Sequence, residues 1–91
     1  MPSLYSDAYI DHGNAYFRAL SADDQWQREL DVQNVDRYST EAHGTEGSAL
    51  HSLYGRKLQA DQDLRDATDA LRLAGKPAEI QAVAELYGSA N

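Results

Sequence analysis

The longest periodic stretch of the chain is residues 46–74, EGSALHSLYGRKLQADQDLRDATDALRLA, and its spacing indicates the fold class. Two rows of residues recur every seven positions, one rich in leucine and the other in alanine. They are Leu50, Lys57, Leu64 and Leu71 in the first row, and Leu53, Ala60, Ala67 and Ala74 in the second. A repeat of seven keeps each row on one side of an α-helix. The stretch therefore predicts one long helix, which begins at residue 46 or 47 and ends at residue 74.

The residues around this helix indicate where the neighbouring segments begin and end. Gly75 follows the helix and Pro77 comes two positions later, which is the usual asymmetry between a helix end and a helix start. A short last helix is expected over residues 77–87, closed by Gly88. On the other side, residues 39–47 contain two glycines and no large apolar residue, so they are predicted to form a loop.

The N-terminal part of the chain predicts two further helices, over residues 4–20 and 22–38. In the first, aromatic and small apolar residues share one wide face when each residue turns the helix by about 100°. Gly13 lies inside it, where glycine costs up to about 1 kcal/mol relative to alanine, and it either permits the close approach of another helix or marks a bend. Ser21 is expected to cap the second helix. Residues 30–38 fit either a helix or a strand.

These segments together predict a single all-α domain, residues 1–91, built as a small bundle of three to five helices. A straight helix over residues 46–74 spans about 40 Å at 1.5 Å per residue, which exceeds the diameter of a compact domain of this size. The long helix is therefore expected either to bend near Gly55 or to project an end that a partner covers. A homodimer is the natural way to cover such an end.

Composition and charge exclude several classes of function. The 91 residues hold 15 acids against 8 bases, a formal charge of −7, and no cysteine. Direct binding to nucleic acid or to an anionic membrane needs clustered Lys and Arg, so neither is expected. The lack of cysteine excludes disulfides, thiolate zinc sites and thiol catalysis. Neither a membrane span nor a secretory signal is visible, which predicts a cytoplasmic protein.

The titratable residues give no strong catalytic or metal-binding motif. His43 and His51 lie near Glu41 and Glu46, but their spacing matches no compact ligand pattern, so no metal site is predicted. His12 falls in the middle of the tyrosine face of the first helix. It is expected to be buried and hydrogen-bonded there, with a pH-sensitive contact or a catalytic base as the alternatives. No cofactor motif is present, and the protein is not expected to be an enzyme.

Three aspartates trace an oblique ridge on the outer face of the long helix: Asp63, Asp66 and Asp69. Catalysis by a carboxyl group requires a desolvated side chain with a raised pKa, whereas an outward ridge interspersed with arginine provides the opposite environment. The ridge is either a solvated face or a docking surface for a basic partner.

The remaining signal is the aromatic content, which includes six tyrosines and one tryptophan. Tyr and Trp are favoured at interfaces, where one end of the side chain is apolar and the other is wet. The candidate partner-binding residues are Tyr5, Tyr9, Tyr16, Phe17, Trp26, Asp63, Asp66 and Asp69.

The sequence favours a non-enzymatic protein that docks on a basic, nucleic-acid-binding protein partner and inhibits or regulates it. Small acidic inhibitors encoded by phages or plasmids, anti-CRISPR proteins among them, are similar in size and charge. The first alternative is a structural or assembly subunit, such as a virion-associated or chaperone-like helical oligomer. The second alternative is a small metal-binding protein or enzyme.

Overall fold

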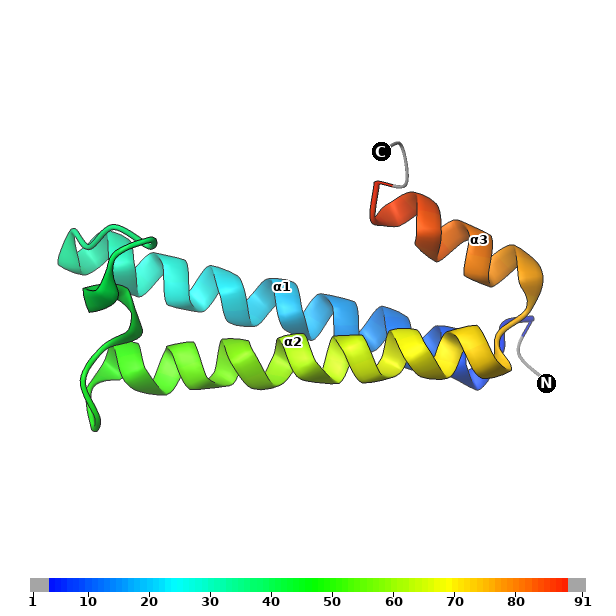
Figure 1. Cartoon of the computed structure of the whole chain (residues 1–91), viewed down its shortest axis with the longest axis horizontal. Coiled ribbons are helices and arrows are strands. Elements are labelled where there is room, and N and C mark those ends of the chain that lie inside the picture. Colours follow the sequence, from blue (N-terminus) through cyan, green and yellow to red (C-terminus); the bar gives the residue numbers. More distant parts are fainter. Residues whose placement is uncertain (1–3, 89–91) are drawn as a thin grey trace.

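The computed structural model describes residues 4–88, which form three α-helices and one short 3-10 helix, without a strand among them. α1 runs over Asp7–Gln33, η1 over Thr40–His43, α2 over Ala49–Ala74 and α3 over Pro77–Leu86. α1 and α2 lie side by side as an antiparallel hairpin, and α3 folds back near the open end (Figure 1). The all-helical prediction is confirmed for these residues, and the three α-helices lie within the expected range.

α1 is a single continuous helix, so the expectation of two separate helices over residues 4–20 and 22–38 is wrong. Its N-cap is Ser6, whose Oγ accepts a hydrogen bond from the Tyr9 N–H at 3.2 Å. Ser21 lies inside the helix, where its hydroxyl accepts from the Gln25 side chain instead of capping a new start. A capping residue begins a helix only where the preceding helix stops, and neither glycine nor proline stops α1 near Ser21.

The end of α1 settles the open question about residues 30–38. The helix continues through Gln33 and ends at Asn34, which adopts the left-handed conformation at φ 56°. The Val35 N–H then donates to the Leu30 carbonyl at 2.9 Å, which satisfies one of the last helical acceptors. The segment is therefore helical at its start and a turn afterwards.

A small hydrophobic core closes the loop end of the hairpin. Trp26, Leu30, Ala42 and Leu50 are buried together, and Tyr54 packs against them. The Trp26 indole is only 3% exposed and donates from Nε1 to the Ala42 carbonyl at 2.9 Å. This corrects the expectation that Trp26 lies on a partner surface, because its ring instead ties the loop to both helices.

Lys57, the charged residue that interrupts the leucine row of α2, is accommodated by ion pairs. Its Nζ lies 2.7 Å from the Asp61 carboxylate and 4.0 Å from that of Asp23 on α1. Asp23 also pairs with Arg37 at 2.9 Å, and that hydrogen bond is the main cause that raises the pKa of Arg37. The arrangement lets a lysine lie between the two long helices without an unpaired charge.

α2 is continuous through Gly55, and α3 of the same chain lies against one side of its C-terminal end. Leu71 of α2 and Val83 of α3 are both buried there. A second copy of the chain is therefore not needed to bury Leu71, whereas Leu73 in the same turn is 90% exposed, and dimerisation stays a prediction. Among residues 4–88, no helix has the length and apolar character needed to cross a membrane.

Candidate interaction site between α1 and α3

α3 is attached at its start by a buried carboxylate that serves two helix termini. Glu79 is 5% exposed and accepts hydrogen bonds from the Ser6 N–H at 2.9 Å, the Ser6 hydroxyl at 2.7 Å and the Lys76 N–H at 2.8 Å. Ser6 caps α1 and Lys76 is the N-cap of α3, so one side chain joins the first turns of both helices. The Lys76 ammonium adds a bond to the Leu4 carbonyl at 2.5 Å.

The hydrogen bonds to Glu79 also set its protonation state. Burial by itself raises the pKa of the carboxyl group, because it disfavours the charged form. The donors from Lys76 and Ser6 favour the anion and outweigh burial, so the pKa is lower than its ordinary value. Glu79 therefore holds α3 as a carboxylate at neutral pH.

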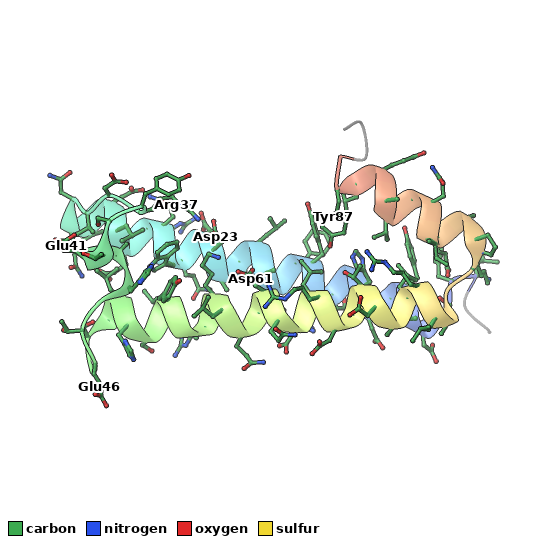
Figure 2. All side chains as sticks on the ribbon, viewed as in Figure 1. Asp23, Arg37, Glu41, Glu46, Asp61 and Tyr87 are labelled. Atoms are coloured by element: carbon green, nitrogen blue, oxygen red, sulfur yellow. The ribbon has the colours of Figure 1, made fainter. Side chains whose placement is uncertain are left out.

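The other end of α3 is held by a hydrogen bond between Tyr87 and His12. The Tyr87 hydroxyl lies 3.0 Å from His12 Nε2, and it approaches the hairpin from the end of α3 (Figure 2). His12 is 2% exposed, and burial lowers the pKa of its imidazole, which favours the neutral ring at pH 7. His12 is thus buried and hydrogen-bonded as expected, although its partner comes from the far end of the chain.

α3 diverges from the hairpin towards its C-terminal end (Figure 1), and a groove of about 290 Å³ opens between α1 and α3. Its lining is almost entirely apolar and aromatic, with His12 at the polar position. The lining residues are Tyr9, His12, Gly13, Tyr16, Phe17, Ala82, Val83 and Leu86. On the α2 side of α3, a hollow of about 330 Å³ is more polar, since it includes Arg65, Asp69 and Arg72.

Large apolar side chains remain exposed beside this groove. Phe17 is 70% exposed although its ring contacts Tyr16, with centroids 6.1 Å apart. Leu20, about one turn further along α1, and Leu86 on the α3 wall are each about half exposed. Single exposed apolar residues are ordinary, but a group of them at an apolar groove makes this face the candidate interaction surface of the molecule.

The excess of negative charge is concentrated in the two helices that form the groove. α1 contains six acids and two bases, and α3 contains two acids and no base. α2 contains four acids and four bases, so it is formally neutral. Other acids, such as Glu41 and Glu46, lie at the loop end of the hairpin, away from α3 (Figure 2). The apolar groove therefore lies between two helices of net negative charge, and four of the six acids of α1 follow its lining residues towards the loop end: Asp23, Asp24, Glu29 and Asp31.

The predicted aspartate ridge belongs to the neutral helix. Asp63 and Asp66 accept hydrogen bonds from Gln59 and Gln62, each at 2.9 Å, and Asp69 pairs with Arg72 at 3.4 Å. None of the three aspartates lines the groove between α1 and α3. The structure therefore does not combine the ridge with the tyrosine face into one site.

Sequence reasoning identified one wall of the groove and missed the other. Tyr9, Tyr16 and Phe17 line it as candidates, and the Tyr5 ring lies 5.2 Å from that of Tyr9 just beside it. The missed lining residues are Gly13, Ala82, Val83 and Leu86, and Tyr87, which bonds His12, was missed as well. Gly13 could have been found from the sequence, because glycine is unfavourable inside a helix and its presence there indicates a special role. By contrast, nothing in the sequence indicates where α3 packs.

The remaining histidines do not form a cluster of metal ligands with the nearby glutamates. Among residues 4–88, no three His, Asp or Glu side chains are placed to hold a metal ion together. The ring of His43 stacks on Tyr54 with centroids 4.2 Å apart, and His51 is exposed on α2.

Comparisons with protein-family models, with curated proteins and with solved structures gave no match to this chain.

Proposed function

We propose that this protein acts without catalysis, by docking the face formed by α1 and α3 on a protein partner with a basic surface. The observation that carries the proposal is an apolar groove, flanked by exposed Phe17 and Leu86, between two helices of net negative charge. Interfaces typically combine an apolar centre with a polar rim that solvent reaches. Complementary charge accelerates encounter and selects among partners.

The chemistry of the partner follows from the sign of this field. A surface rich in Lys and Arg is characteristic of proteins that bind nucleic acid. An acidic protein that covers such a surface competes with the phosphate backbone for the same side chains. We therefore propose that docking inhibits or regulates a nucleic-acid-binding partner, in the manner of phage- or plasmid-encoded inhibitors, and that it takes place in the cytoplasm.

The buried titratable groups already have structural roles that support a non-catalytic function. His12 and Glu79 are the buried polar side chains among residues 4–88, and each holds one end of α3. Neither is left with an unsatisfied polar atom in the described part of the chain. A general acid or base needs access to a substrate proton, and both groups are engaged in internal hydrogen bonds.

The charge distribution also weighs against the structural-subunit alternative. A homo-oligomer that covered the groove with its own counterpart would bring two acidic faces together, and like charges at an interface oppose association.

The test compares charge reversal at two surfaces of the full-length chain. Partners are captured from the source cell, identified, purified and then used for affinity measurements. The double variant Asp24→Lys, Glu85→Lys is expected to weaken binding about tenfold or more, because it reverses charge on both helices that form the groove. The matched control Asp66→Lys, Asp69→Lys changes the ridge of α2 by the same charge and is expected to bind as wild type. Equal loss in both, or capture of acidic partners, contradicts the proposal.

A further inference from the structure

The fold of the free chain does not require a glycine at position 13. It lies inside α1, which continues unbroken on both sides of it, so it does not end the helix. A Cβ atom placed on it meets nothing within 4 Å, so it does not permit the close approach of another segment. Its backbone is not in the left-handed region. The close approach of another helix that the sequence suggested is therefore absent, and alanine would fit here with a better helix propensity.

What glycine does at this position is to keep the groove open. Gly13 lines the groove together with the aromatic residues of α1, and Ala82 contributes another small side chain from α3. Because the space around a Cβ on Gly13 is empty, a larger side chain there would project into that space. A residue that is unfavourable for its own helix and leaves a cavity beside it is expected where function overrides local preference.

We infer that the groove at Gly13 receives one large apolar side chain from a basic helical segment of the partner. This inference rests on the proposed function and names the part of the partner that binds. The volume of about 290 Å³ is at or below the lower end of pockets for cofactors and drug-sized ligands, which is roughly 300 Å³. It suits a leucine or phenylalanine side chain, as in the mode in which an amphipathic helix lies in a groove.

The net charge of α1 and α3 determines which residues the partner's segment is expected to carry beside its apolar side chain. α1 and α3 carry net negative charge, so Lys or Arg beside the apolar anchor would lie against acidic helices. A second copy of this chain does not meet that requirement, because its own groove-forming helices are acidic. The imidazole of His12 is already bonded to Tyr87, which leaves the apolar walls as the main recognition element.

The first experiment uses a synthetic peptide of about 15 residues, long enough to form a helix, with leucines on one face and lysines on the other. It is titrated into the full-length ¹⁵N-labelled protein, and backbone chemical shifts are followed. The largest shift changes are expected at Gly13, Phe17, Ala82 and Leu86. Two control peptides, with alanine for leucine or glutamate for lysine, are expected to bind at least about tenfold more weakly.

The second experiment blocks the groove without weakening the helix. Gly13→Leu fills the space and improves helix propensity, so the variant is expected to fold with a raised Tm and to lose peptide affinity about tenfold or more. Gly55→Leu is the matched control, because Gly55 is also inside a helix with nothing within 4 Å of a Cβ, and it lies outside the groove. It is expected to gain stability and to bind the peptide within about twofold of wild type.

Each contrary outcome has a defined meaning. If Gly13→Leu binds the leucine–lysine peptide as wild type does, or if the alanine peptide binds equally well, the groove is not the site, while docking by charge still stands. If the wild type binds no peptide, the inference fails. The proposed function is then tested separately by the affinities of the charge-reversal variants for the captured partner. If the free protein sediments as a dimer that Gly13→Leu dissociates, the occupant is a second copy and the inference is overturned.

Discussion

At the scale of single residues, Trp26 joins the loop to both long helices. Its ring centroid lies 5.1 Å from that of Tyr54 on α2, and its Nε1–H donates to the Ala42 carbonyl. The Arg37 guanidinium lies over the ring at 4.9 Å. A buried aromatic side chain with these contacts contributes to the stability of the hairpin and not to recognition by a partner.

Trp26→Ala is therefore expected to lower the free energy of unfolding by about 3–5 kcal/mol, as is typical of a large aromatic side chain removed from a core. Urea denaturation followed by far-UV circular dichroism measures the change. Tyr38→Ala is the control, since Tyr38 is 89% exposed and its removal is expected to change stability by about 0.5 kcal/mol or less. A loss of similar size in both variants would contradict the assignment of Trp26 to the core.

His12 makes stability depend on pH in the mildly acidic range. Burial lowers its pKa below the ordinary value of 6.5, so the unfolded chain binds the proton more readily than the folded chain does. The stability from neutral His12 is present above pH 6.5 and is lost as the pH falls below that value. Denaturation midpoints at about pH 7.5 and 5.5 are expected to show this decrease.

The control for this pH dependence is a pair of histidine variants. His12→Gln retains a group that hydrogen-bonds Tyr87 but does not titrate, so the pH dependence is expected to be smaller than in the wild type. His51→Gln replaces an exposed histidine, and this variant is expected to show the same pH dependence of stability as the wild type. If the two variants respond to pH alike, His12 is not the group responsible.

At the scale of elements, α3 depends on the junction that Glu79 makes with the N-cap of α1. Glu79→Gln keeps the shape of the side chain but places an amide group among three donors, so one acceptor is lost. We expect α3 amides to exchange with deuterium faster in this variant, while the loop-end core of α1 and α2 keeps its protection. Glu85→Gln is the control, because it changes an exposed carboxylate on the same helix.

The same junction also responds to acid. The pKa of Glu79 is lowered from its ordinary value of 4.5, so its stabilisation is present above that pH and is lost as the pH falls through the lower folded value. Both anchors of α3 therefore weaken on acidification, His12 first and Glu79 afterwards. In the deuterium-exchange experiment, Glu79→Gln could instead change the exchange rates of amides in α1, α2 and α3 to the same extent. That result would show that α3 does not depend on the Glu79 contact.

At the scale of the whole molecule, the separation of charge between the helices is expected to steer the approach of the proposed basic partner. Exposed charges are screened over about 10 Å at 0.1 M salt and about 3 Å at 1 M salt. The affinity for a basic partner is therefore expected to fall steadily as salt rises, while the apolar contacts in the groove persist. Isothermal titration across a salt series measures this, and an affinity that does not change with salt would contradict docking by charge.

The sequence contained enough information for the parts of the fold that depend on neighbouring residues. The repeat of seven predicted α2, and Leu50 and Leu71 of its leucine row are buried. Gly75 and Pro77 placed the junction with α3, since caps and proline act within one helical turn. The prediction of a helix start at Ser21 was wrong for a related reason. A capping residue is only a local signal, and no neighbouring residue ends the helix at that point.

The groove itself depends on contacts between residues far apart in the chain. Glu79 meets Ser6 across 73 positions and Tyr87 meets His12 across 75, and no short-range pattern encodes either pairing. Helix periodicity and capping arise from backbone geometry within a few residues, so the sequence alone indicated the all-helical class, α2, α3 and the charge of each segment, but not the continuity of α1 through Ser21. The direction in which α3 returns, the burial of Trp26 and the empty space at Gly13 follow from long-range packing and buried hydrogen bonds, which exist only once the chain has folded.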